Sequence, residues 1–180
     1  RHHGGAFLLR IEDTDRDRST PEAVQAVFDA LDWLGLDVDG EPVYQSTRVD
    51  RHLAAAERLL RNGAAYREDK GGTGRGECVV FRMPGEAVSF HDEIKGSLRK
   101  EADDMKDFVI VRSDGTPVFH LSNVVDDADM GITHIIRGDD HIENTYRHVA
   151  LWRALGAAVP KYANLRMIVD EQGGRYSKRD

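Results

Sequence analysis

The stretch that decides the fold class is Ala6-Phe7-Leu8-Leu9-Arg10-Ile11-Glu12-Asp13-Thr14-Asp15. Its first part, residues 6–11, is a largely apolar run of the kind that forms a buried strand in a parallel sheet. Three carboxylates follow at the carboxyl end of that strand, where ligands bind in open α/β sheets. The pattern therefore indicates either a site for an ammonium group or metal ion, or a solvated loop in which Asp and Thr cap a turn.

Outward from this stretch, strands and helices alternate. A helix is expected to start at Ser19-Thr20-Pro21-Glu22, where Ser19 or Thr20 can cap and Glu22 can complete a capping box with Ser19, and to end at Gly35. Further predicted elements are a helix over 49–62, strands over 78–83, 88–91, 108–112, 118–125 and 133–137, and a helix over 145–155. This order predicts an α/β fold with a mostly parallel sheet.

The texture changes after Tyr66. Residues 70–76 are basic and glycine-rich, two short strands follow, and an acidic stretch lies near residues 101–104. We interpret residues 67–107 as a small β-rich insertion between two parts of one domain, residues 1–66 and 108–180. The Gly72-x-Gly74 pair has no strand before it or helix after it, so it is a linker rather than a dinucleotide site.

The composition excludes several classes of protein. The 180 residues carry a formal net charge of −7, and 40% of them are hydrophobic. No apolar run approaches the roughly 20 residues that span a bilayer, so we expect a cytoplasmic protein with no membrane partner. The acidic balance argues against a general nucleic-acid coat but leaves room for a local basic patch. A single cysteine, Cys78, excludes a disulfide framework within the chain and a zinc site built on several thiolates.

A second polar group lies in residues 118–127. His120 and Asn123 are interleaved with apolar residues, which we interpret as a buried strand that brings polar groups to one place. Buried polar groups need partners, so the stretch is either part of a binding site or an internally satisfied network. Acidic residues at 126, 127 and 129 do not have EF-hand spacing.

Two further groups contain arginine. Arg137 opens Arg137-Gly138-Asp139-Asp140-His141 just past a predicted strand, and a guanidinium can hold a carboxylate through two parallel hydrogen bonds. Residues 175–179, Arg-Tyr-Ser-Lys-Arg, place three cations and a hydroxyl on a glycine-flanked loop, which suits a polyphosphate. A solvated surface charge run is the alternative for this loop.

Together and in this order, the motifs resemble the catalytic domain of bacterial glutamyl-tRNA synthetases, which are class I aminoacyl-tRNA synthetases. The matching stretches are residues 3–15, Tyr44-Gln45-Ser46, residues 107–127, residues 134–145 and Tyr176-Ser177-Lys178-Arg179. The resemblance implies a Rossmann-like catalytic domain with a short insertion. In that family the first stretch directly follows the ATP-binding HIGH motif, and the basic loop looks like the KMSKS motif. Because the chain opens in an apolar run and stops in that loop, we expect truncation at both ends and a fragment that is inactive alone.

The resemblance also assigns roles to residues. Glu12 would hold the α-ammonium group of glutamate, and Arg137 would pair with its side-chain carboxylate. Phe119 and Asn123 would line the amino-acid pocket. Lys178 and Ser177 would be the catalytic residues at the triphosphate. The residues assigned to ATP binding are Lys178, Arg175, Arg179 and Asp140.

The chain departs from the family pattern at several positions. Phe119 stands where tyrosine is usual, so one hydroxyl contact to substrate is missing, and Arg175-Tyr176 replaces Lys-Leu or Lys-Met. Tyr146 replaces a common proline. The insertion is short, and Cys78 stands alone where some relatives carry a cysteine-rich zinc site, so no zinc is expected.

The implied function is that of a glutamate–tRNA ligase, which uses ATP, assisted by Mg²⁺, to form glutamyl-adenylate and transfers glutamate to the 3′ end of tRNA(Glu). We expect a monomer. The alternatives are a glutamyl-queuosine tRNA(Asp) synthetase and a non-catalytic module that binds glutamate or RNA. Glutaminyl enzymes usually carry Asp-Asp-Thr-Asn where this chain has Glu12-Asp13-Thr14-Asp15. The queuosine enzymes usually carry leucine in place of Thr14, together with zinc-type cysteines.

Overall fold

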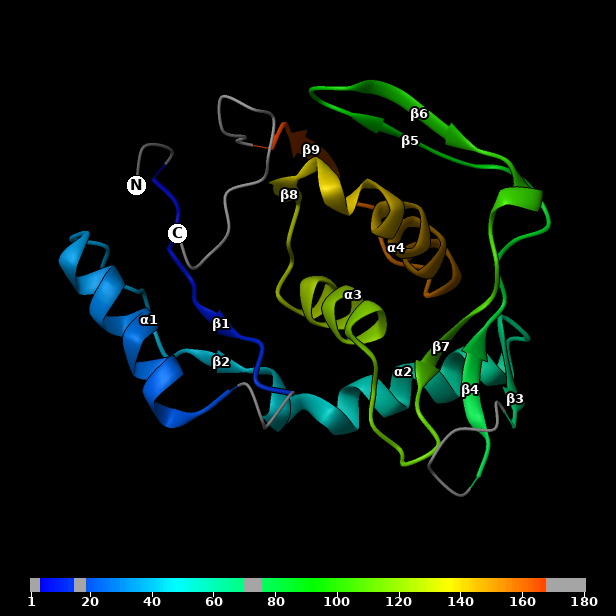
Figure 1. The fold of residues 1–180 in the computed structure, drawn as a ribbon, viewed down its shortest axis with the longest axis horizontal. Helices are drawn as coiled ribbons and strands as arrows, with labels where there is room; N and C mark the ends of the chain where they lie inside the picture. The colour runs from blue at the N-terminus through cyan, green and yellow to red at the C-terminus, as the bar shows by residue number, and fades with distance from the viewer. Residues whose placement is uncertain (1–3, 15–18, 70–75, 168–180) are drawn as a thin grey trace, which may run out of the picture. The chain divides into compact units, whose positions relative to one another are not determined.

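The structure is a computed structural model that describes residues 4–14, 19–69 and 76–167. The chain divides into two compact units, residues 1–51 and residues 52–180. Figure 1 shows the elements of each unit along the chain.

The first unit contains two short parallel strands and a helix. Its elements are β1 (Arg10–Ile11), α1 (Pro21–Trp33), β2 (Val43–Tyr44) and the 3-10 turn η1 (Gln45–Arg48). Arg10 lies opposite Val43, and Ile11 opposite Tyr44. The carbonyls of Phe7 and Leu9 also accept hydrogen bonds from the amides of Asp39 and Val43, so the apolar run predicted as a strand is extended over most of its length.

The predicted start of α1 is confirmed, and one of the two predicted caps is used. Thr20 is the N-cap, and its hydroxyl oxygen accepts a hydrogen bond from the amide of Ala23 at 3.3 Å. The predicted capping box between Ser19 and Glu22 is therefore wrong, because a box needs the N-cap residue and the residue three positions later.

The second unit combines two sheets with three helices. The strands are β3 (Ala65–Glu68), β4 (Cys78–Phe81), β5 (Val88–Asp92), β6 (Gly96–Lys100), β7 (Phe108–Val111), β8 (His134–Gly138) and β9 (Lys161–Leu165). Most of α2 (Val49–Arg61) belongs here, with α3 (Phe119–Asp129), α4 (Ile142–Ala154) and the turns η2 (Ala102–Asp104) and η3 (Asp139–His141). One sheet has the order β3-β4-β7 and is antiparallel; the other has the order β6-β5-β9-β8, with β5-β9 and β8-β9 parallel and β5-β6 antiparallel.

Helices α3 and α4 pack together, α3 against β7 and α4 against β5, over one hydrophobic core (Figure 1). The largest fully buried side chains include Trp152, Tyr162 and Phe81. Phe90 joins sheet to helix, since its ring lies 5.2 Å from Tyr146 and 5.6 Å from Tyr162 between centroids. Such tilted and edge-to-face aromatic pairs add to the stabilisation from buried area.

The predicted strand over 118–125 is wrong, because this segment is helix α3. Leu121, Val124 and Val125 are buried at helical spacing, so packing of one helix face overrides the β preference of the valines. On the same helix, Asp126 is fully buried and accepts a hydrogen bond from Nε2 of His52 on α2 at 2.9 Å.

Strand pairing crosses both ends of the predicted insertion, residues 67–107. Strand β4 pairs with β3 on one side and β7 on the other, and β5 pairs with β9. Strands β3, β6 and β9 have no counterpart in the sequence-based prediction. Two sheets thus join the predicted insertion to the rest of the second unit.

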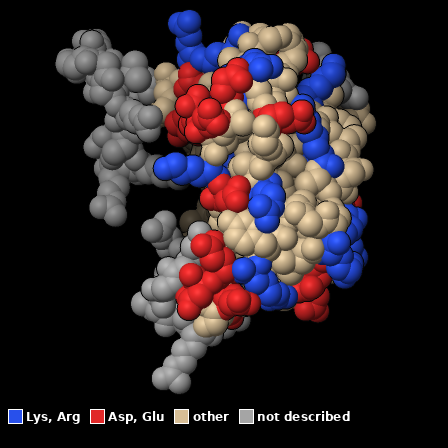
Figure 2. All heavy atoms as spheres, turned by 90° about the vertical axis from the view of Figure 1, so that its right-hand side faces the viewer, with Lys and Arg blue, Asp and Glu red and all other residues tan. Residues whose placement is uncertain are grey.

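Charges of both signs are interspersed on the face drawn in Figure 2, with uncharged side chains between them. This agrees with the modest excess of acidic residues in the sequence, 32 against 25 basic. Among the described helices, none is long and apolar enough to cross a membrane.

A buried carboxylate fixes the junction of β5 with β9. Asp92 Oδ1 accepts hydrogen bonds from the amides of Ile94 and Lys95, at 2.9 and 2.8 Å. Its Oδ2 accepts from the amide and the side-chain nitrogen of Asn164, at 2.9 and 2.6 Å. Burial raises the pKa of Asp92, but the four hydrogen bonds outweigh it, so the pKa lies below its ordinary value.

We expect Asp92→Ala to lower the free energy of unfolding by at least about 2 kcal/mol, because buried N–H groups would lose their acceptor. Asp92→Asn is the matched variant that keeps the shape and removes the charge. Since the folded pKa is depressed, the carboxylate stabilises the fold above pH 3.8, and this contribution is lost as the pH falls below that value. Denaturant unfolding at several pH values should therefore show the difference between wild type and Asp92→Asn shrinking in acid; a constant difference would contradict the assignment.

Candidate functional site

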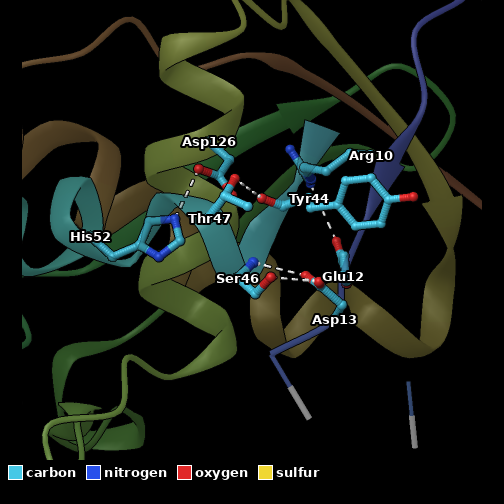
Figure 3. A network of polar contacts seen from close by, with 8 residues as sticks. All are labelled: Arg10, Glu12, Asp13, Tyr44, Ser46, Thr47, His52 and Asp126. Atoms are coloured by element: carbon cyan, nitrogen blue, oxygen red, sulfur yellow. Dashed lines mark hydrogen bonds and ion pairs between the residues drawn. The ribbon is translucent and has the colours of Figure 1, made fainter. Parts of the chain in front are cut away.

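In the first unit, the end of β1 presents an ion pair (Figure 3). Arg10 Nη2 lies 3.3 Å from Glu12 Oε1, and the Glu12 side chain is 43% exposed. Glu12 can therefore meet a ligand from solvent while the guanidinium of Arg10 holds one of its oxygens. This is the carboxylate that the sequence assigned to an ammonium group.

Asp13 differs from Glu12, because both of its carboxylate oxygens accept hydrogen bonds from one serine. Ser46 donates from its amide to Oδ1 at 2.8 Å and from its hydroxyl to Oδ2 at 2.6 Å (Figure 3). Ser46 follows β2 just as Asp13 follows β1. The two contacts tie the carboxyl ends of the parallel strands together beside Glu12, which explains why the separate motifs 10–15 and 44–46 belong to one local structure.

In the second unit, Arg137 on β8 is a half-buried guanidinium. Its Nη2 donates to the hydroxyl of Thr145 at 2.7 Å and to the carbonyl of His141 at 3.4 Å. Neither bond uses Nη1 or Nε, and Nε is buried without a hydrogen-bond partner among the described residues. The N–H groups of Nε and Nη1 are therefore available to donate to an anionic ligand such as a carboxylate.

Burial lowers the pKa of Arg137, and the phenol of Tyr162 and the carboxylates of Asp127 and Asp140 oppose that effect. The guanidinium stays charged, because its ordinary pKa is so high. Its Cζ lies 5.6 Å from the centre of the Tyr162 ring. Burial raises the pKa of Tyr162 to about 12, so this phenol is neutral beside the cation.

One face of α4 connects Arg137 with the residues predicted to line the pocket. Thr145 on that face holds Arg137, and three residues further on His148 contacts the ring of Phe119 at 5.9 Å between centroids. Phe119 opens α3 and is 39% exposed, whereas Asn123, one turn later, is only 8% exposed. In the second unit the structure therefore brings Phe119 and Arg137 to one helix face.

Asp140, in η3, lies close to the backbone of Gly138. A Cβ placed on Gly138 would come within 2.6 Å of Asp140 Oδ1. Gly138 has a φ of −66°, which any residue adopts. A Cβ at residue 138 would therefore displace the Asp140 carboxylate, which is the end of a flexible side chain, and this carboxylate lies close enough to act on the charge of Arg137.

Four predicted site residues lie outside the described residues: Arg175, Ser177, Lys178 and Arg179. Cys78 is buried in β4 and free. Within residues 4–14, 19–69 and 76–167, no three His, Cys, Asp or Glu side chains are grouped as metal ligands.

Sequence reasoning did not single out Thr145 or His148. Both are buried polar residues, 0% and 2% exposed, and their spacing of three places them on one helix face. The same spacing relates His120 and Asn123 on α3. That helical spacing of polar residues within an apolar stretch was the available signal.

Comparison with known proteins gives the class and then the family. The fold matches a crystal structure of a glutamate tRNA ligase from Elizabethkingia meningosepticum in complex with its amino acid, with a TM-score of 0.86, 28% identity, and coverage of 99% of this chain and 46% of that one. A putative arginyl-tRNA synthetase from Campylobacter jejuni matches at a TM-score of 0.57 and 20% identity, which supports the shared fold alone. The fold is thus that of a class I aminoacyl-tRNA synthetase catalytic domain.

The family model for tRNA synthetases class I (E and Q), catalytic domain, matches residues 1–72 and 67–180, and the chain belongs to that family. Among curated relatives, a glutamate–tRNA ligase of Phenylobacterium zucineum is 44% identical over 99% of this chain, and one of Legionella pneumophila is 43% identical. The chain spans about 45% of the length of these relatives. The predicted α/β synthetase fold and the family resemblance are confirmed.

The two matched segments overlap at residues 67–72. These residues are the start of the predicted insertion, residues 67–107. The alignment with the Phenylobacterium protein extends over 210 residues, more than the 180 of this chain. Some positions of the relative therefore lack a counterpart in this chain.

The hydrogen bond between Thr145 and Arg137 can be tested by substitutions that change the hydroxyl and the methyl group of residue 145 separately. Thr145→Val keeps the volume but removes the acceptor of Arg137 Nη2, and we expect a loss of about 1–3 kcal/mol in the free energy of unfolding. Thr145→Ser keeps the hydroxyl and should retain more of that stability. Denaturant unfolding of both variants measures the effect; a greater loss in the serine variant would show that the methyl group, not the hydrogen bond, matters.

Proposed function

We propose that the full-length protein is a glutamate–tRNA ligase. Family membership and the named relatives support the reaction class. The observation that carries the choice of amino acid is Arg137, whose half-buried guanidinium keeps donors that no described residue uses. A carboxylate satisfies such donors, whereas the amide of glutamine would turn an N–H group toward one of them.

Two groups would hold glutamate at its two ends. Glu12, exposed and steadied by Arg10, would bind the α-ammonium group, and Arg137 would bind the side-chain carboxylate. Phe119 and Asn123 would line the pocket for the amino acid. With Phe119 in place of a tyrosine, this lining offers an aromatic surface without a phenolic hydroxyl.

The reaction has two steps. The α-carboxylate of glutamate attacks the α-phosphate of ATP, which gives glutamyl-adenylate and releases pyrophosphate. A terminal ribose hydroxyl of tRNA(Glu) then attacks the activated carbonyl, which gives glutamyl-tRNA and AMP. Positioning and charge neutralisation supply most of the catalysis in such reactions at phosphorus.

The basic loop would neutralise the leaving pyrophosphate. We assign Lys178 and Ser177 to this role, and we assign Arg175, Arg179 and Asp140 to ATP binding. Mg²⁺ is expected to arrive with ATP, and no step here passes through a metal held by the described residues. Absence of zinc, a monomeric state, a cytoplasmic location and an acceptor-stem role for residues 67–107 are further parts of the proposal.

Lys178→Ala in the full-length protein should slow glutamate-dependent ATP–pyrophosphate exchange, measured with tRNA present, by on the order of 10²–10³-fold, because one preorganised cation is lost. Lys161 on β9 has a side chain that is 65% exposed and lies outside residues 67–107, and Lys161→Ala is the control. Exchange at the wild-type rate in the Lys178 variant would remove this residue from the mechanism.

Arg137→Ala should raise the KM for glutamate by on the order of 100-fold, because charge-assisted hydrogen bonds are lost, while the KM for ATP changes little. Arg137→Lys keeps the charge without the planar fork and should fall between the two. Exchange kinetics with glutamate and ATP varied separately measure both constants. Equal loss of both affinities would instead indicate misfolding.

A further inference from the structure

Two imidazole rings, those of His120 and His148, join α3 to α4 beside the ring of Phe119. Nδ1 of His120 lies 3.0 Å from Nε2 of His148, and the rings meet edge to face at 71°. His148 is 2% exposed. This pair has no part in the function proposed above, although both rings contact Phe119.

The surroundings fix the direction of the hydrogen bond between the rings. Arg147 Nη1 lies 3.5 Å from Nε2 of His120, and a guanidinium only donates. Nε2 of His120 must therefore accept, which places the ring proton on Nδ1 and makes Nε2 of His148 the next acceptor. The order is Arg147 to His120 to His148, with both imidazoles neutral.

Aromatic contacts link the two histidine rings to Phe119, which is predicted to line the pocket. The ring of His120 lies between Phe119, at 5.5 Å, and Phe108 of β7, at 5.3 Å between centroids. Phe119 also meets His148 at 5.9 Å. An aromatic ring at the start of a helix is thus held by two imidazoles, which the hydrogen bond orients.

The cationic groups around the two histidines explain why the neutral state of the pair is important. The groups that act on the pair are Arg137 on β8, Arg147 on α4 and His141 in η3, all capable of positive charge. A proton added to either imidazole would break the donor order and place a second cation near Arg137, where it would compete for the same anionic ligand or for its counter-charges.

We propose that His148 and His120 are positioning residues for recognition of the amino-acid side chain. The neutral imidazole pair, oriented by its hydrogen bond, fixes the ring of Phe119. Because the pair carries no charge, Arg137 remains the cation that the carboxylate of the substrate meets on this helix face. The proposal rests on the assignment of Arg137 to the glutamate carboxylate. Burial, with Arg147 and then Arg137 nearby, lowers the pKa of His120 to about 4. Burial, with Arg137 foremost among its neighbours, lowers that of His148 to about 2.

The kinetic test uses two substitutions at one position in the full-length protein. His148→Leu removes the acceptor and should raise the KM for glutamate about tenfold, with the KM for ATP and kcat changed less than twofold. His148→Gln places an amide oxygen near the position of Nε2 and should recover most of the lost affinity. His134→Leu, on an exposed residue at the start of β8, is the control for loss of a histidine.

The proposal is overturned if both His148 variants keep wild-type KM values, or if KM for glutamate and KM for ATP rise together. NMR of ¹⁵N-histidine-labelled wild-type protein at pH 7 tests the pair without substrate, and both rings should be neutral with the proton on Nδ1. A charged ring, or a proton on Nε2 of His120, would overturn the proposal even if the protein activates glutamate. Absence of glutamate activation with the expected tautomers would instead contradict the proposed function.

Discussion

The buried carboxylate of Asp92 is the constraint on which much of the second unit depends. Its four hydrogen bonds come from the turn after β5 and from Asn164 on β9. Strand β9 is the parallel neighbour of β8, and β8 carries Arg137 opposite Asn164 in the register. A charge buried without partners is costly. The sheet is therefore stable only in the strand pairing that supplies hydrogen bonds to the carboxylate of Asp92. The same pairing sets where the guanidinium of Arg137 emerges.

Much of the fold could be predicted from local signals, and the failures have a common cause. Helix α1 followed from Thr20, Pro21 and the glycine after it, because caps and breakers act locally. Helix α3 was mistaken for a strand, since its valines and aromatic residue favour β structure and only packing against α4 and β7 selects the helix. Strand β9 was missed for a similar reason: it is defined by its partners β5 and β8, which are distant in sequence.

For the candidate site, residue types were predictable but their partners were not. The sequence predicted that Arg137 binds a carboxylate, from its chemistry and from its place at a strand end. It could not predict that Thr145 would hold one nitrogen of that arginine and leave Nε without a partner in the described part of the chain. Likewise, Asp13 was recognised as part of an acidic motif, but only the pairing of β1 with β2 reveals that Ser46 occupies both of its oxygens.

The contact between Gly138 and Asp140 has a practical consequence for separating position from charge. Because the backbone at residue 138 is compatible with any side chain, a single methyl group there would act as a small wedge against one carboxylate oxygen. Exchanging Asp140 itself alters charge, polarity and geometry at once. A methyl group at residue 138, two positions before Asp140 and next to Arg137, would displace the carboxylate without removing its charge, so the effect of its placement on Arg137 could be separated from the effect of its charge.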